Sequence, residues 1–169
     1  MRLYSGKVPT IAGEIVHGLT EAGDIETDRP HEVELDIQSV LTNYLTIERE
    51  ATEKAKDLLQ ARGLSQGEFG RMRKLAAEQK GIKVGDEMLD YLLDQLVEIL
   101  LHSNNVDEVY AQDVDLRRKM AVTLKRHMAI DEEIEEEVRG KLKHVTEGTR
   151  TWEVEYARIK DEIRRRRGV

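Results

Sequence analysis

Apolar residues recur every three or four positions along most of the chain, the spacing of a helix with one buried face. The clearest segment runs from Pro30 to Arg62, where nothing interrupts the period, and Gly63 follows it. At about 1.5 Å per residue, a helix of this length is roughly 50 Å long. The pattern therefore predicts an all-α protein with at least one long helix.

Five other segments carry the same spacing. We expect helices over about Pro9–Ala22, from Ser65, from Asp86 to Asn104, over about Asp113–Val145 and after Gly148. The fourth helix along the chain is the most apolar and is expected to be the most buried. Gly140 lies inside the second long helix, where it costs about 1 kcal/mol relative to alanine and makes a kink conceivable.

The two halves of the chain show the same order of short, long and short helices. Aligned positions include Ile37 with Met120, Leu41 with Leu124, and Phe69 with Trp152. We therefore expect an elongated helical bundle of two related three-helix repeats, residues 1–85 and 86–169, packed as one unit. Chance similarity between amphipathic helices is the alternative.

Composition supports an elongated shape and excludes several classes of protein. Charged residues make up 36 % of the chain and aromatic residues 4 %, against about 25 % charged residues in a typical domain. The absence of cysteine excludes disulfide scaffolds, thiolate metal sites and cysteine nucleophiles. We find no signal-peptide pattern and no apolar run long enough for a membrane span, so we expect a cytoplasmic protein. The net charge of −7 argues against wholesale nucleic-acid binding but permits a local basic patch.

Several stretches resemble a known family. They are the opening Met1-Arg2-Leu3, Leu100–Tyr110 (LLHSNNVDEVY), Asp115–Met120 (DLRRKM) and Glu147–Trp152 (EGTRTW). Together they resemble the bacterial family catalogued as domain of unknown function 507, in a duplicated form, over nearly the whole chain. The resemblance implies a bacterial, cytoplasmic, helical protein and supplies no catalytic or binding residue.

Metal and catalytic motifs are sparse. A di-iron site in a helical bundle needs two Glu-x-x-His motifs, and only Glu14 and His17 have that spacing. His127, Asp131 and Glu135 are spaced four residues apart, but acidic residues are so abundant in this stretch that we prefer the interpretation of an acidic, solvated helix face. No nucleophile elbow, phosphate loop or dinucleotide motif is present. We therefore expect no cofactor, no metal and no enzymatic activity.

Two groups of residues are candidates for partner contacts. In the connector before the second long helix, Asp107, Glu108 and Tyr110 form either an exposed recognition loop or part of a corner that Val106, Val109 and Tyr110 hold against the core. In the last helix, Trp152 and Tyr156 lie one turn apart. They either anchor that helix or form an exposed binding hot spot.

The chain ends with Arg164, Arg165, Arg166 and Arg167 in succession. These arginines either bind nucleic-acid phosphates or neutralise the acidic run from Asp131 to Glu137, in this protein or in a partner. We expect a protein-interaction or scaffold module without a membrane anchor and with oligomerisation open. A nucleic-acid- or ribosome-associated factor that uses the tail with Arg150 and Arg158 is the alternative, and a metal-dependent enzyme at Glu14 and His17 is a third hypothesis.

Overall fold

The computed structural model describes residues 1–169 and consists almost entirely of helices, which confirms the all-α prediction. The α-helices are α1 (Val8–Glu21), α2 (Pro30–Arg62), α3 (Phe69–Gln79), α4 (Met88–His102), α5 (Asp113–Met128), α6 (Ile130–Lys141) and α7 (Arg150–Arg167). Short 3-10 turns, η1 (Ser5–Lys7), η2 (Gln66–Glu68) and η3 (Gly85–Glu87), lead into α1, α3 and α4. A membrane-spanning helix is not among them, since none combines the required length with an apolar composition.

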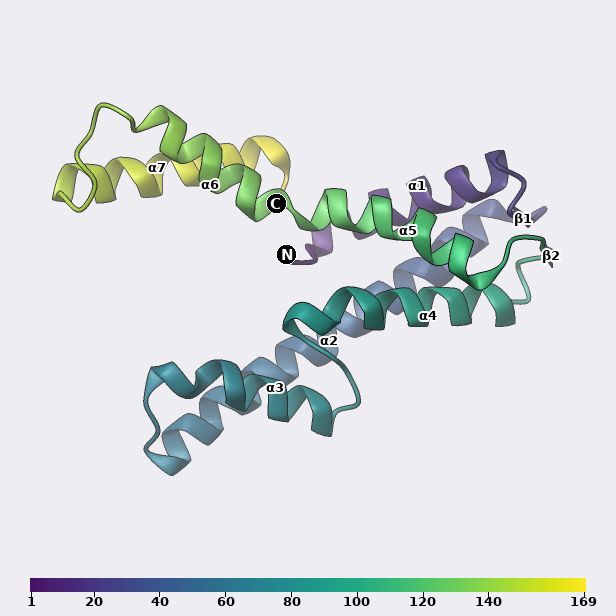
Figure 1. Cartoon of the computed structure of the whole chain (residues 1–169), viewed down its shortest axis with the longest axis horizontal. Coiled ribbons are helices and arrows are strands. Elements are labelled where there is room, and N and C mark those ends of the chain that lie inside the picture. The colour runs from purple at the N-terminus through teal and green to yellow at the C-terminus, as the bar shows by residue number, and fades with distance from the viewer.

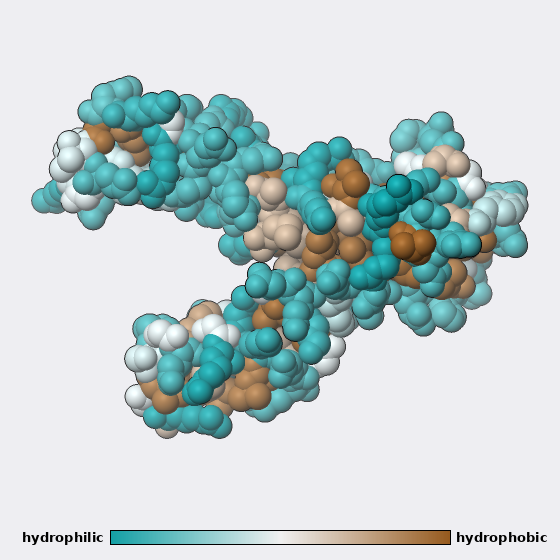
Figure 2. All heavy atoms as spheres, in the orientation of Figure 1, coloured by the Kyte–Doolittle hydropathy of each residue, from teal (hydrophilic) through white to brown (hydrophobic).

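The molecule has the outline of a fork with two arms (Figure 1). Helices α1, α4, α5 and the first part of α2 form the body, whose core is one cluster of 27 buried residues. One arm is the hairpin of α6 and α7, and the other is the end of α2 paired with α3. The space between the arms is open in the space-filling view (Figure 2).

Each arm has a small hydrophobic cluster of its own. In the α6–α7 arm it consists of Ile130, Ile134, Val138, Leu142, Ile159 and Ile163. In the α2–α3 arm it consists of Ala55, Leu59 and Met72, with Phe69 packed against them. Each arm therefore buries apolar surface of its own beyond the body, although α3 also contributes Ala76 and Ala77 to the body's core and Tyr4 packs against the α6–α7 cluster.

A two-stranded antiparallel sheet closes the end of the body opposite the arms. Strands β1 (Ile25–Glu26) and β2 (Glu108–Val109) pair with Ile25 opposite Val109 and Glu26 opposite Glu108. The sequence pattern did not predict these strands, because two residues are too few to show an alternating period. The sheet joins the loop after α1 to the loop after α4.

The second long helix was predicted wrongly as one continuous element. It is broken at Ala129 into α5 and α6, and α6 ends at Lys141 rather than at Val145. The Met128 carbonyl accepts a hydrogen bond from the Arg2 N–H over 3.0 Å. In a continuous helix that carbonyl would bond the N–H of Glu132. The break therefore comes from the N-terminal segment and not from Gly140, which remains helical in α6.

The remaining helix boundaries agree closely with the sequence. Helix α2 occupies Pro30–Arg62 as predicted, and Gly63 ends it in the left-handed region at φ 60°. Ser65, where one helix was expected to begin, lies just before η2, the turn that leads into α3. Asp86, where the next helix was expected to begin, lies within η3, the turn that leads into α4. The division of the chain at residue 85 falls in η3 and stays a prediction, since the body's core takes residues from both sides of it.

Candidate interaction surfaces

Three of the four tail arginines form ion pairs with α6. The closest nitrogen–oxygen distances are 2.6 Å for Arg166 with Glu137, 2.6 Å for Arg167 with Glu133 and 3.4 Å for Arg164 with Asp131. Helix α7 runs back along α6, which places these residues of the tail opposite the acidic run. Of the two alternatives for the tail, neutralisation of acids within this protein is the arrangement observed.

The arginines and acids of this arm shift one another's pKa values. The hydrogen bond from Arg166 lowers the pKa of the Glu137 carboxyl, and the hydrogen bond to Glu133 raises the pKa of the Arg167 guanidinium. Arg165 is exposed and takes part in no ion pair. It is therefore the one tail arginine without an ion-pair partner in this protein.

Trp152 and Tyr156 stack on each other in α7, with ring centroids 4.9 Å apart and an interplanar angle of 22°. Both are half-buried and pack against the cluster of the α6–α7 arm. Arg139 lies 5.8 Å from the Trp152 ring, and Lys160 lies 5.2 Å from the Tyr156 ring. These contacts agree with an anchoring role for the aromatic pair.

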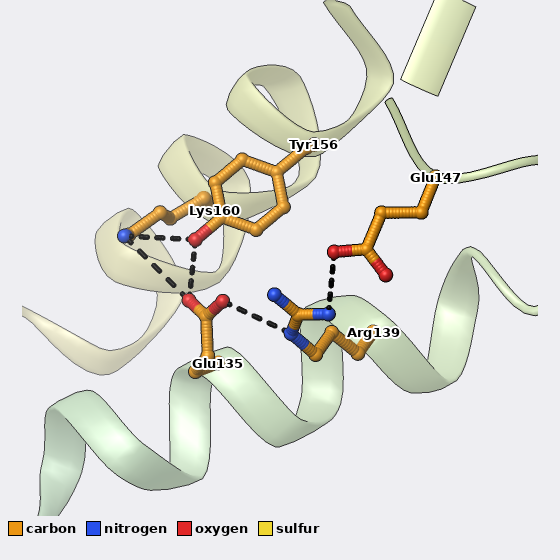
Figure 3. Close-up of polar contacts among 5 residues, drawn as sticks. All are labelled: Glu135, Arg139, Glu147, Tyr156 and Lys160. Carbon is orange, nitrogen blue, oxygen red and sulfur yellow. Dashed lines mark hydrogen bonds and ion pairs between the residues drawn. The ribbon is translucent and has the colours of Figure 1, made fainter. Parts of the chain in front are cut away.

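The polar side chains around this pair form a connected network (Figure 3). The Tyr156 hydroxyl donates to Glu135, and Lys160 Nζ lies 3.2 Å from that hydroxyl and 3.8 Å from Glu135 Oε2. Arg139 Nε donates to Glu135 over 3.2 Å, and Arg139 Nη1 donates to Glu147 over 3.0 Å. The Tyr156 hydroxyl, and then Arg139, lower the pKa of Glu135 although burial opposes this. Glu135 is thus an ionised acceptor that joins α6 to α7.

A groove of about 1020 Å³ runs along the same arm. Charged side chains of both signs line it, among them Glu135, Arg139, Lys160 and Arg164, and Met1 is its one apolar lining residue. Small-molecule pockets are lined mainly by apolar side chains. The groove is therefore a charged surface with almost no apolar lining.

The connector residues lie at the opposite end of the molecule, around β1 and β2. Asp107 accepts a hydrogen bond from the Asp28 N–H over 2.9 Å, and Glu108 sits opposite Glu26 in the sheet. Tyr110 is 64 % exposed, and its hydroxyl donates to Glu26 over 2.6 Å.

Val106 and Val109 pack against the main core as the corner hypothesis required. Its third residue, Tyr110, was assigned wrongly to that corner, because the ring points to solvent. The sequence candidates therefore form two separate surfaces, one on the sheet end of the body and one on the α6–α7 arm.

The residues considered for metal binding have other partners. Glu14 forms an ion pair with Arg126 and lies 2.9 Å from His127 Nε2, so His127 faces α1 and not the acids of α6. His17 is exposed. The hydrogen bond with His127 lowers the pKa of Glu14, and Arg126 lowers it further. No three histidine or acidic side chains of residues 1–169 gather in an arrangement that could hold a metal ion.

One further surface was missed by the sequence analysis. A notch of about 530 Å³ lies at the base of the fork, between the N-terminal residues, α2, α3 and the start of α4. Arg2, Arg49 and Arg73 line it. These arginines are far apart along the chain, and no local motif connects them, so only the fold brings them together.

The sequence profile of the family described as "Protein of unknown function (DUF507)" matches residues 1–169. The chain belongs to this family. No curated protein matches the chain. Family membership confirms the resemblance carried by the opening residues and the three internal stretches, and the family description names no activity.

Proposed function

We propose that this member of the family is a non-enzymatic protein-interaction module of the bacterial cytoplasm. The observation that carries the proposal is the fork itself, in which two helical hairpins leave the body and each buries its own apolar cluster. Such hairpins present long helix faces on either side of an open space (Figure 1). Helix faces of this kind are common sites of protein–protein contact.

The nature of the arm surfaces favours a macromolecular partner over a small substrate. The groove of the α6–α7 arm is lined by charged residues of both signs, and these charges are mostly paired within the protein. A charged rim of this kind contributes orientation and specificity to a protein interface, while apolar contacts supply most of the affinity.

Nucleic-acid binding through the tail is the second candidate, and it has less support. A tail arginine must be free to neutralise a phosphate, yet three of the four already bind acids of α6. Arg165 and Arg150 are exposed and outside these pairs. They are the residues through which this alternative would have to act.

Affinity capture from the native organism, followed by mass spectrometry, tests both candidates. Wild type is compared with the charge-reversal variant R150E/R165E, and each sample is divided into nuclease-treated and untreated halves. A protein recovered equally from wild type and R150E/R165E after nuclease treatment supports the interaction module. Loss of all recovered proteins on nuclease treatment, or on R150E/R165E substitution, supports the nucleic-acid candidate instead.

We also infer that the two halves arose by duplication of one unit. Two contacts between the halves support this inference. The loop after α1 reaches α5 through Asp24 and Lys119, and the loop after α4 reaches α2 through Asn105 and Asp36. Superposition of residues 8–79 on residues 88–167 tests it: the inference requires a rotation close to a two-fold, and a much smaller rotation contradicts it.

A further inference from the structure

The notch at the base of the fork combines an apolar floor with a positively charged wall. Leu45 of α2, Phe69 of α3 and Met88 of α4 line the floor, together with Met1, whose side chain is 61 % exposed. The N-terminal residues that line the notch lie at the base of the fork, where the two arms diverge (Figure 1). At about 530 Å³ it is large enough to take two or three side chains of a partner.

The charge of the notch is unbalanced. Its one acidic lining residue, Glu48, already accepts a hydrogen bond from Arg73 over 2.5 Å, and both side chains are more than two-thirds buried. Arg2 and Arg49 are exposed and form no ion pair; Arg2 lies over the ring of Tyr4 at 5.2 Å, and its charge also lowers the pKa of Asp131 at longer range. Two guanidinium groups therefore remain without an ion-pair partner at an apolar site.

This imbalance stands out because acids exceed bases in the chain, 34 to 27. On the other side of Met1, in the groove of the α6–α7 arm, the corresponding charges are mostly satisfied: Asp131 binds Arg164, and Glu135 binds Arg139 and Lys160. The unsatisfied charge at the fork is thus positive and lies in the notch.

We propose that the notch binds an acidic amphipathic helix of a partner protein. Apolar side chains of that helix fill the floor, and its carboxylates pair with Arg2 and Arg49. A helix lays its apolar face into a groove through residues spaced three or four apart, and arginine–carboxylate pairs at the rim fix its direction. This proposal rests on the proposed function and names the kind of partner for it.

A nucleic acid fits the same site less well. Binding a nucleic-acid strand without sequence preference takes a row of cations along the backbone and aromatic rings that stack on bases. The notch offers two free guanidinium groups and one half-buried phenyl ring, Phe69. Its apolar floor is instead matched by leucine or phenylalanine side chains.

Selection from a displayed library of 16-residue peptides tests the proposal directly on the full chain. The peptides carry fixed leucines at positions of helical spacing and Glu, Lys or Gln at all other positions. The target is wild type, the notch variant R2E/R49E or the matched control K54E/R62E. Lys54 and Arg62 are exposed cations of α2 that lie outside the notch and form no ion pair, so the control makes the same charge change. Circular dichroism verifies that both variants keep the fold.

We expect Glu-rich peptides to be enriched on wild type and on K54E/R62E, and to bind R2E/R49E at least tenfold more weakly in fluorescence anisotropy. Enrichment of Lys-rich or Gln-rich peptides, an absence of enrichment, or equal binding to R2E/R49E overturns the proposal. Light scattering adds one more outcome: a wild-type dimer that R2E/R49E dissociates means that a second copy occupies the notch, which also overturns it.

The selection does not depend on finding the native partner, so the two hypotheses fail separately. If capture from the native organism yields a partner whose recovery is the same with R2E/R49E, the proposed function stands and the notch is not its site. If the selection succeeds but no protein is captured from the organism, the notch keeps its helix-binding chemistry and the proposed function fails.

Discussion

Lys119 Nζ donates a hydrogen bond to Asp24 Oδ2 over 2.6 Å and thereby ties α5 to the loop between α1 and β1. Asp24 is 9 % exposed and is the only charged residue among the buried ones. Its backbone carbonyl also accepts hydrogen bonds from the N–H groups of Tyr110 and Ala111. Asp24 thus links the loop before β1 both to α5 and to the loop after β2.

Replacing Asp24 by alanine is expected to lower the free energy of unfolding by about 2 kcal/mol, because the Lys119 ammonium loses its partner in a partly buried position. Urea denaturation followed by circular dichroism measures the change. The matched control is R118A, which removes an exposed pair with Asp115 and should cost less than about 0.5 kcal/mol. Equal effects of D24A and R118A would contradict this assignment.

The tail arginines should stabilise the α6–α7 arm. The variant R164A/R167A is expected to lower the stability of that arm by about 1 kcal/mol, since both residues pair with partly buried acids of α6. Trp152 is the only tryptophan of the chain and belongs to this arm, so its fluorescence reports the arm's unfolding. R165A, which removes an arginine outside these pairs, should leave the fluorescence transition unchanged.

Acid should destabilise the same arm. The hydrogen bond from Tyr156 lowers the pKa of Glu135 from its ordinary value of 4.5. Burial alone would raise the pKa of Asp131, but the neighbouring Tyr4 and the hydrogen bond and charge of Arg164 outweigh it, so this pKa is lowered too. Carboxyls with lowered pKa values hold fewer protons in the folded state than in the unfolded state. Their contribution is therefore present above about pH 4.5 and is lost as the pH falls through the folded-state pKa values.

The Trp152 fluorescence midpoint in urea, measured between pH 7 and pH 3, checks this direction. We expect the midpoint to fall mainly below about pH 4.5 and the fall to be smaller in E135Q. E136Q is the matched control, because Glu136 is exposed and lies outside the ion pairs of the arm. A midpoint that rises on acidification, or an identical profile in E135Q and wild type, argues against the network as the cause.

Two glycine substitutions should act in opposite directions. Gly140 lies in the last turn of α6 with no atom near the position of an added Cβ, so G140A is expected to stabilise the protein by about 0.5 kcal/mol. Gly63 ends α2 at φ 60°, where a side chain is strained, so G63A is expected to destabilise it by about 1 kcal/mol. Thermal unfolding of both variants tests the pair, and a stabilising G63A would be inconsistent with the left-handed end of α2.

The sequence was sufficient to predict those helices whose course and ends are determined by residues close together in the chain. Helix α2 was predicted to the residue because its apolar period is unbroken and Gly63 permits the left-handed conformation that ends it. The break at Ala129 was not predictable in this way, since alanine is the best helix former and the cause is a hydrogen bond from Arg2 at the other end of the chain.

The candidate surfaces show the same contrast between features that local sequence predicts and features that depend on the tertiary fold. The acidic run and the four arginines are visible as complementary charges in the sequence, and they do pair. The sequence could not say whether Val109 or Tyr110 faces the core, because a two-residue strand sets that orientation. The notch depends on residues from three helices and the N-terminus, so it follows from the tertiary fold alone.

The unbroken α2 and the broken α5–α6 give the two arms different mechanics. Helix α2 crosses the body and continues into its arm as one rod of 33 residues, about 50 Å long. A force applied at α3 is therefore transmitted by a stiff lever to the sheet end of the body. The α6–α7 arm joins the body through the helix break at Ala129 and through the N-terminal segment, where Arg2 bonds to Met128, Met1 pairs with Glu132 and Tyr4 packs against the arm's cluster. No helix continues from the body through this junction, so we expect the arm to bend there under the same load. We expect the α2–α3 arm to be stiff and the α6–α7 arm to be compliant.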